Sequence, residues 1–392
     1  MRIVILTTQL GKGPGGKVVA NIISELASQN YKLLVICSEC HVNTAVNINL
    51  KVVPFKWLFP MKLTKLFIVM FRVTLRHRYW QSYVYRNFKN DVTDFNPDFI
   101  YAIGSGGTQV VYNLGLAIAK YSNVRLALHL LDPIPGPKGW ENYEIYRKSL
   151  IHTFKKSLKE ADLITMGNHH MLEYQQRNLK FDILGKSFIV PDPVVNKPIK
   201  LSSLSQKYVL TFLGSFYGAR KPDRLLEGFS EYNKNNPEAE LHIVGTNRIN
   251  LNHFDVSEDA KKKILFQGFT TNLLEVFERT RVLIDVDADI DEDVFISSKL
   301  KEYLSVNRMI VSITGENSPS RQLLSGITKS VIVSDFDKFK ISKAIEKAMD
   351  TKYDVNLFDD RKSVLAFLNV SRICNEIVKN FERISNKDYG TQ

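Results

Sequence analysis

The stretch YVLTFLGSFYGARKPDR (residues 208–224) contains the pattern that decides the fold class. Its apolar run Tyr208–Leu213 predicts a buried strand, the glycines of the loop Gly214–Lys221 permit sharp turns, and Pro222 favours the first turn of a helix. Strand-like and helix-like segments then alternate as far as Ser312. Such alternation predicts a parallel sheet covered by helices on both faces, because parallel strands need long crossover connections.

A second series of the same kind begins at the N-terminus. Arg2–Thr7 predicts a strand, Gly11–Gly16 a glycine-rich loop and Lys17–Gln29 a helix, and further strands follow as far as Val190. The Pro- and Ser-rich segment from Pro191 onward predicts a linker between the two series. We therefore expect two facing doubly wound Rossmann-like α/β domains with an interdomain cleft. The expected parts are an N-terminal domain over 1–195, a linker over 196–206, a C-terminal domain over 207–360 and a C-terminal helix over 361–392 that packs back on the N-terminal domain.

Length and composition agree with this division. A chain of 392 residues is longer than one hydrophobic core usually organises, and its 44% hydrophobic and 24% charged residues are typical of a soluble globular protein. We find neither an apolar run that could span a membrane nor the cleavage pattern of a secretory signal, so we expect a cytoplasmic protein. Cys37, Cys40 and Cys374 are too few for a disulfide framework, and the CxxCH pattern at Cys37 is interpreted as two incidental, partly buried thiols.

Residues 51–90 form a basic and aromatic stretch. No Asp or Glu occurs between His41 and Asn90, whereas Lys, Arg, Phe, Trp and Tyr are interleaved there, and Lys62–Trp80 is predicted to be helical. Three interpretations are open: a surface that docks on an anionic membrane, a basic helical face packed on its own domain, and a nucleic-acid surface. We favour the membrane and do not expect nucleic acid to be a partner.

The loop between the first strand and the first helix also has an alternative interpretation. Gly11, Gly13 and Gly16 spell GxGxxG, and Glu39 stands near the position of a ribose-binding acid, which together suggest a nicotinamide-dependent oxidoreductase. Four residues separate the strand from Gly11, whereas the dinucleotide turn is tight. We keep this reading as an alternative, because the N–H groups at a helix start can bind other anions equally well.

Two segments of the C-terminal half carry candidate anion-binding residues. Arg220 and Lys221 precede a helix start, an arrangement that can hold a diphosphate, although a solvated cation pair has the same pattern. Further on, Ser297 or Ser298 is predicted to cap another helix.

On that second helix Lys299 and Glu302 are three residues apart and therefore share a face. Lys299 suits phosphate oxygens, and Glu302 can accept hydrogen bonds from ribose hydroxyls. An ordinary surface Lys–Glu pair would show the same spacing.

Together these segments resemble the retaining glycosyltransferases of the two-Rossmann-domain (GT-B) type, family 4, and especially the bacterial members that build surface polysaccharides. The N-terminal half resembles them more loosely, through Gly11–Gly16 and His129–Pro135. The matching C-terminal segments are Phe212–Leu226, Ile264–Asp285, Lys299–Val311 and Gly315–Gly326. The resemblance implies a UDP- or GDP-sugar donor, no cofactor besides that substrate, and a glycan or lipid-linked acceptor on the side of the N-terminal domain.

The resemblance also implies a role for individual residues. Arg220 and Lys221 would neutralise the departing diphosphate, and Glu302 would hold the nucleotide ribose. His129 would face the donor sugar, with Asp132 as a hydrogen-bond partner. The predicted catalytic residues are Arg220, Lys221 and His129, and the predicted donor-binding residues are Gly15, Gly16, Gly214, Ser298, Lys299, Glu302 and Asp132.

One position departs from the family pattern. Val294 stands where the first acid of the E-x7-E motif is expected, so the residue that contacts the sugar is unassigned among Asp291, Glu292 and Asp293. The DxDxD run that starts at Asp285 is expected to be a surface-exposed acidic turn, and we expect transfer without a metal ion. The missing acid also leaves open a catalytically silent binding subunit of the same fold.

Overall fold

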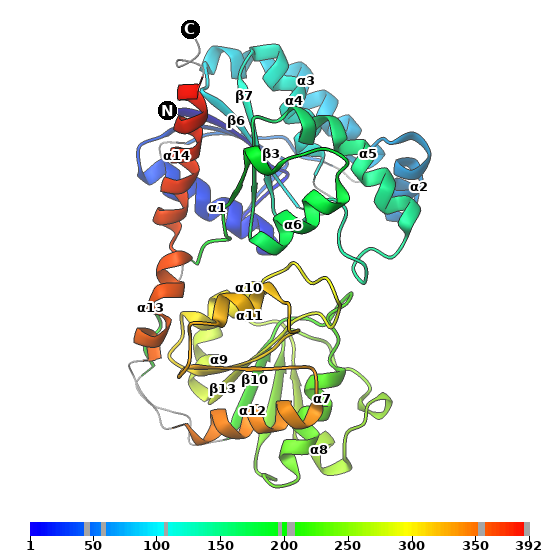
Figure 1. Cartoon of the computed structure of the whole chain (residues 1–392), viewed down its shortest axis with the longest axis vertical. Helices are drawn as coiled ribbons and strands as arrows, with labels where there is room; N and C mark the ends of the chain where they lie inside the picture. Colours follow the sequence, from blue (N-terminus) through cyan, green and yellow to red (C-terminus); the bar gives the residue numbers. More distant parts are fainter. Residues whose placement is uncertain are drawn as a thin grey trace. The chain divides into compact units, whose positions relative to one another are not determined.

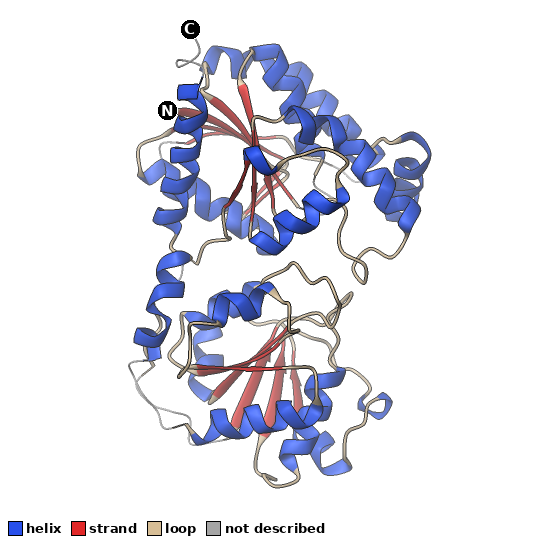
Figure 2. Cartoon of the chain, viewed as in Figure 1, coloured by secondary structure: helices blue, strands red, loops and turns tan. Residues whose placement is uncertain are grey.

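The computed structural model of the protein describes the chain outside residues 43–47, 56–59, 106–108, 195–197, 202–207, 352–356 and 388–392. The chain divides into two compact units, of which unit 1 comprises Met1–Val195 with Leu368–Gln392 and unit 2 comprises Asn196–Phe367 (Figure 1). In each unit the strands of a parallel sheet lie between helices (Figure 2). The predicted fold class, two doubly wound Rossmann-like halves, is therefore confirmed, and the cleft between them stays a prediction.

Unit 1 contains a parallel sheet in the order β5-β3-β1-β6-β7-β8-β9. Within it Leu6 lies opposite Ile36 on one side and Ala102 on the other. Its central strands are buried along almost their whole length, because helices cover both faces of a parallel sheet. The strands of this sheet are β1 Arg2–Leu6, β3 Lys32–Cys37, β5 Ile48–Val52, β6 Phe99–Gly104, β7 Arg125–Leu130, β8 Leu163–Met166 and β9 Ser187–Ile189, and β2 Gln9–Leu10 pairs with β4 Glu39–Cys40 in a separate sheet. The helices are α1 Gly13–Ser28, α2 Met61–Phe71, α3 Leu75–Phe95, α4 Val110–Ser122, α5 Glu144–Glu160, α6 His169–Asn178 and α14 Val370–Lys387.

Unit 2 contains a parallel sheet in the order β12-β11-β10-β13-β14-β15. The first strand of the unit, β10, is central. The next two strands, β11 and β12, lie on one side of it, and β13, β14 and β15 lie on the other. In sheets of this topology ligands bind at the carboxyl ends of the strands, near the point where the order reverses. The strands are β10 Val209–Leu213, β11 Glu240–Val244, β12 Ile264–Gln267, β13 Val282–Val286, β14 Met309–Ile313 and β15 Val331–Ser334. The helices are α7 Asp223–Asn233, α8 Glu258–Lys263, α9 Leu273–Arg279, α10 Ser298–Leu304, α11 Pro319–Leu324, α12 Lys338–Asp350 and α13 Leu357–Phe367.

Two predicted boundaries differ from the structure. Part of the expected linker, 196–206, packs on unit 2, because Leu201 N donates to Asn307 Oδ1 (2.8 Å) and Ile199 N donates to Ser305 O (2.7 Å). The expected single helix over 361–392 is two helices. The first, α13, ends unit 2, and the second, α14, packs on α1 in unit 1, where Phe381 stacks on Phe99 with ring centroids 4.4 Å apart.

Two predicted elements of unit 1 differ as well. The helix α1 begins at Gly13 and not at Lys17, since Pro14 suits a first helical turn, and the GxGxxG run therefore opens the helix. The predicted helix Lys62–Trp80 is divided between α2 and α3, because Arg72 adopts a left-handed conformation (φ 57°) that ends α2.

Candidate functional site

Two glycine-containing loops meet at the carboxyl edge of the sheet in unit 2. Gly214 follows β10 with φ 125°, a conformation that favours glycine, and its N–H donates to Val244 O (2.8 Å). Thr246 Oγ1 donates to Gly214 O (2.6 Å), and a Cβ at Gly245 would lie 3.4 Å from the same oxygen. These contacts hold the two loops together at the point where the strand order reverses.

The helix α10 lies over this edge. Tyr303 Oη accepts a hydrogen bond from Leu213 N (2.8 Å), and a Cβ on Gly214 would lie 3.8 Å from Lys299 Cγ. On the exposed side Lys299 Nζ donates to Glu302 Oε2 (2.9 Å). The predicted pair therefore does share one face, directly above the glycine loop.

The helix cap is more specific than predicted. Ser297 is the N-cap, and its Oγ accepts from the N–H groups of Lys299 (3.2 Å) and Leu300 (3.5 Å). Ser298, a predicted donor-binding residue, is the first residue of the helix. Two N–H groups of the first turn are thus already occupied, which leaves less of the helix start for a phosphate.

A buried arginine that the sequence analysis missed fixes the other end of α10. Arg361, from α13, is completely buried and donates to Tyr303 O (3.2 Å) and Val306 O (2.6 Å), and also to Arg308 O. Burial lowers its pKa to about 9, so the side chain is charged at neutral pH. The guanidinium therefore binds carbonyl groups at the end of α10 and in the segment that follows it.

The two predicted diphosphate cations have different environments. Lys221 is exposed, whereas Arg220 is half-buried and its Nε is buried without a hydrogen-bond partner. The Arg220 charge counteracts the burial that raises the pKa of Asp285, Asp287 and Asp293. Arg220 thus lies beside a buried acidic cluster, and Lys221 faces solvent.

The DxDxD run that starts at Asp285 is mostly buried, whereas the sequence analysis expected a surface-exposed turn. Asp285 and Asp287 are each 1% exposed, and only Asp289 of the DxDxD run is exposed. Thr314 Oγ1 (2.7 Å) and Ser318 Oγ (2.8 Å) donate to Asp287 Oδ2. The reason is the register of β13, which continues inside the sheet beyond Ile284. In the described part of the chain no three His, Cys, Asp or Glu side chains are placed to hold a metal ion together.

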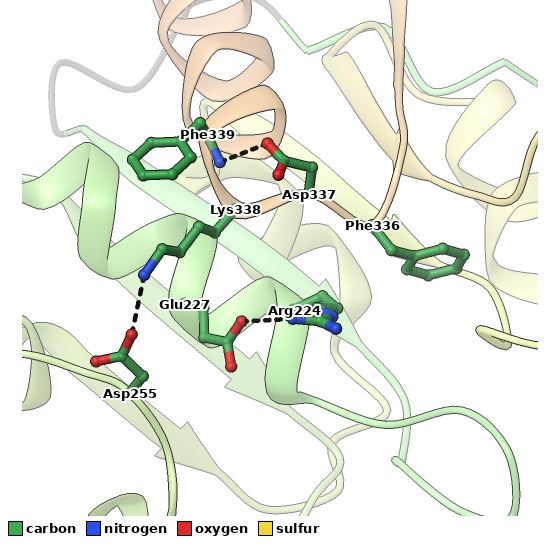
Figure 3. Close-up of a pocket in the computed structure, with 7 residues that line it drawn as sticks. All are labelled: Arg224, Glu227, Asp255, Phe336, Asp337, Lys338 and Phe339. Atoms are coloured by element: carbon green, nitrogen blue, oxygen red, sulfur yellow. Dashed lines mark hydrogen bonds and ion pairs between the residues drawn. The ribbon is translucent and has the colours of Figure 1, made fainter.

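Two hollows lie at the same edge of unit 2. One, of about 660 Å³, is formed by the loops after β13, β14 and β15. Its charged lining residues are Asp289, Asp291, Asp293, Glu316, Asp335, Arg321 and Lys340. The other, of about 520 Å³, lies at the starts of α7 and α12, where Lys338 pairs with Asp255 (2.9 Å) and Arg224 with Glu227 (3.1 Å), as Figure 3 shows. Because its charged groups are paired with one another, the second hollow offers fewer free contacts to a ligand.

The predicted glycines of unit 1 lie in the first turn of α1. A Cβ on Gly15 would lie 3.4 Å from Ser105 Oγ and Leu131 Cδ1, so Gly15 faces the loops that follow β6 and β7. Gly16 O accepts a hydrogen bond from Gly11 N (2.8 Å), and no side chain caps this helix. Glu39, the candidate ribose acid of the oxidoreductase alternative, pairs with Lys12 (3.0 Å).

The structure places His129 inside unit 1, not at its surface. The side chain is 1% exposed, and Nδ1 is hydrogen-bonded to Thr165 Oγ1 (2.7 Å). Nε2 is buried without a partner, and burial lowers the pKa of His129 to about 4, so the imidazole is neutral. Asp132 follows the same strand in a half-buried position. His129 is therefore a buried residue of unit 1, and its role toward the donor sugar stays a prediction.

The basic stretch is divided between packed and exposed side chains. Trp80 is buried and donates to Val53 O (3.0 Å), Lys51 pairs with Asp91 (3.5 Å), and Lys89 lies over the Tyr121 ring (4.3 Å to its centroid). These contacts agree with a basic face packed on its own domain. In contrast, the outer face of α2 exposes half or more of the side chains of Leu66, Met70 and Phe71, beside the exposed Lys62 and Lys65. Lys56, Trp57 and Phe59 lie outside the described residues.

No helix of the described chain combines the length and apolar character that a membrane span requires. No protein-family model matches the sequence, and no curated protein matches it. Among solved structures, the chain is similar to a sucrose-phosphate synthase from Thermosynechococcus elongatus (TM-score 0.67, 11% identity, 99% of this chain and 100% of that one). It is similar to HepE of Anabaena, solved in complex with UDP and glucose (0.64, 12%, 98% and 100%). It is also similar to WaaG, a glycosyltransferase involved in lipopolysaccharide biosynthesis (0.63, 12%, 96% and 98%). The whole chain therefore has the GT-B fold of these glycosyltransferases.

Proposed function

We propose that the protein is a glycosyltransferase that moves a sugar from a nucleoside-diphosphate sugar to an acceptor. The observation that carries the proposal is the position of Lys299 and Glu302 on one face of α10, above Gly214 and at the point where the strand order reverses. That edge is where doubly wound sheets bind nucleotides. The solved HepE structure, which has the same fold, contains UDP and glucose.

In the proposed complex the diphosphate lies near Lys299 and the exposed Lys221, and the ribose near Glu302. Departure of a nucleoside diphosphate leaves negative charge on its terminal phosphate, and positioned cations lower the free energy of that state. Ribose hydroxyls are hydrogen-bond donors and match the carboxylate acceptor of Glu302. In this proposal the Lys299–Glu302 ion pair holds both groups ready before the donor binds.

We further propose transfer with retention of configuration, without a metal ion, in the synthesis of a cell-surface polysaccharide. The resemblance to family 4 supports this, and so does the occurrence of the same fold in WaaG. The alternative of a nicotinamide enzyme is weakened because Glu39 is paired with Lys12 and because β2 lengthens the connection between β1 and the glycine run, whereas the dinucleotide turn is tight.

A panel of nucleotides tests the proposed function. We expect UDP or GDP, and their sugar conjugates, to raise the melting temperature, whereas NAD does not. We expect Lys221→Ala and Glu302→Gln to lower nucleotide affinity about tenfold, the loss of one charge-assisted contact each. Lys262→Ala is the matched control, because Lys262 is exposed on α8, outside the proposed site, and pairs with Asp259 (2.9 Å). Stabilisation by NAD alone would refute the proposal, and binding without donor hydrolysis or transfer would indicate the silent subunit.

We also propose that the protein acts at the cytoplasmic face of a membrane, where a lipid-linked acceptor is available. The exposed apolar side chains of α2, together with Lys62 and Lys65, fit the headgroup region of an anionic bilayer. The exposed Tyr143 and Ile145 at the start of α5 extend this surface, because α5 packs on α2 and Lys65 lies over the Tyr146 ring (5.1 Å).

Flotation with liposomes tests the membrane proposal. We expect binding to phosphatidylglycerol vesicles to be lost in the double variant Leu66→Ser and Met70→Ser and weakened in Lys62→Glu. Arg86→Glu on α3 is the control, because Arg86 is exposed outside the α2 surface. Arg72 is unsuitable for this test, because its guanidinium donates to Ser149 Oγ and holds α2 on α5. Binding that survives all these changes would refute the proposal.

A further inference from the structure

The end of α10 is the place where both connections of unit 2 to the rest of the chain are attached. The segment Ser305–Arg308 follows α10, and the incoming chain pairs with it: Ile199 N donates to Ser305 O (2.7 Å), and Asn307 N donates to Ile199 O (3.3 Å). The outgoing chain is α13, the last helix of the unit, which packs on α10. The end of α10 is therefore held by contacts from two distant parts of the sequence.

Arg361 of α13 makes hydrogen bonds to the end of α10. Its guanidinium donates to Tyr303 O (3.2 Å), Leu304 O (3.4 Å) and Val306 O (2.6 Å), and its side chain is completely buried. One side chain thus fixes three main-chain carbonyl groups in the last turn of the helix and just after it. Because Arg361 does not reach the surface, a ligand that arrives from solution cannot contact it.

The helix that this arginine holds also carries the proposed donor contacts. α10 comprises only Ser298–Leu304, and a helix this short has too few internal hydrogen bonds to be stable alone. Its place is therefore set by its contacts, among them Tyr303 Oη, which accepts from Leu213 N (2.8 Å) at the end of β10. Lys299 and Glu302 belong to the same two turns, so a shift of the last turn moves both of them.

We propose that Arg361 is a positioning residue of the donor site, which sets the affinity for a nucleoside diphosphate without touching it. The inference rests on the proposed function. Groups that bind a ligand must be held to within about 0.5 Å of their productive positions by a surrounding shell of packed and hydrogen-bonded residues. Arg361 belongs to that shell for Lys299 and Glu302. An arginine that only stabilised the fold would change how many molecules are folded, but not how tightly the folded molecules bind.

Calorimetry with UDP and GDP tests the inference. We expect Arg361→Ala to weaken nucleotide binding about tenfold and Arg361→Lys, which keeps the charge but loses the planar fork, about threefold. Arg281→Ala is the matched control and should leave the affinity unchanged. Arg281 also donates to a carbonyl near a helix end, Met349 O (2.6 Å), but it stands before β13, at the opposite edge of the sheet. Circular dichroism ensures that each variant is more than about 90% folded, so that unfolding changes the apparent affinity by only about a tenth.

A double-mutant cycle tests whether Arg361 acts through α10. In wild type, Glu302→Gln is expected to lower the affinity about tenfold, the loss of one charge-assisted contact. In the Arg361→Ala background the same change should cost only about twofold, because a displaced carboxylate contributes little to binding. Two residues that act independently would show the same factor in both backgrounds.

The outcomes separate the inference from the proposed function. If neither UDP nor GDP binds wild type, the proposed function fails and this inference fails with it. If a nucleotide binds, three results would each overturn the inference alone: wild-type affinity in folded Arg361→Ala, an equal loss in Arg281→Ala, or the same cost of Glu302→Gln in both backgrounds. Should Arg361→Ala fail to fold, Arg361→Lys replaces it in both measurements, and wild-type affinity there overturns the inference as well.

Discussion

Replacing Arg361 with alanine should destabilise unit 2 selectively. The guanidinium donates to Val306 O (2.6 Å), to Ser330 Oγ (2.9 Å) and O (3.1 Å), and to Arg308 O, all inside the unit. Four bonds with a charged donor contribute about 6–12 kcal/mol before the cost of burying the charge, which is several kcal/mol. We therefore expect the free energy of unfolding to fall by about 3–5 kcal/mol, or the melting temperature by about 10 °C.

The distribution of tryptophan permits a unit-resolved assay. Trp57, Trp80 and Trp140 all belong to unit 1, so tryptophan fluorescence reports its unfolding, whereas far-UV circular dichroism reports both units. In urea, Arg361→Ala should shift the dichroism transition of unit 2 to lower concentration and leave the fluorescence transition in place. Arg361→Lys keeps the charge but loses the planar fork, and we expect about half the effect. A change below about 1 kcal/mol, or a shift seen by fluorescence alone, would refute the reasoning.

Three further outcomes follow from the same contacts. Gly228→Ala should destabilise unit 2 by about 1–3 kcal/mol in urea unfolding, because a Cβ there would lie 2.3 Å from Ile341 Cγ2, and Gly228→Ala combined with Ile341→Ala should cost less than the sum of the two single losses. Burial and the neighbouring acids raise the pKa of Asp285 to about 7 in the folded state, so the folded state binds more protons than the unfolded chain between about pH 4 and pH 7. Stability should therefore fall as pH rises through that window. In Asp285→Asn, the unfolding midpoint measured by circular dichroism should depend less on pH than in wild type. Glu302→Gln should change the unfolding free energy by less than about 1 kcal/mol, since its pair with Lys299 is partly exposed, although nucleotide affinity falls.

The sequence predicted the alternation of strands and helices well, because parallel strands that are buried on both faces must be continuously apolar. It also predicted the shared face of Lys299 and Glu302, which depends only on helical periodicity. The limits of α1 and α2 were less predictable. They depend on one backbone conformation at Arg72 and on Pro14 at a helix start, which are local choices that hydrophobic periodicity does not record.

The errors at the site have a common cause. The sequence of a DxDxD run does not show whether its aspartates are exposed or buried. Asp285 is buried because it lies within β13, opposite Ser312 of β14. Arg361 was missed for the same reason: a lone arginine in a charged segment gives no signal that it reaches carbonyl groups 53–58 residues earlier. His129 was correctly placed on a strand, and its burial is set by the strands on either side of it.

The different environments of Arg220 and Lys221 change how the proposed donor site works. Burial raises the pKa values of three carboxyl groups, those of Asp285, Asp287 and Asp293, and the Arg220 charge counteracts that rise in each. The Arg220 charge is therefore already engaged before any ligand arrives. A diphosphate that approached it would also approach the carboxylates, so Arg220 adds little net attraction. We expect the attraction to come from the exposed Lys221 and from Lys299, whose partner Glu302 is only partly buried. In this arrangement we expect Arg220 to offset the charge of the buried acids and the two lysines to bind the anion.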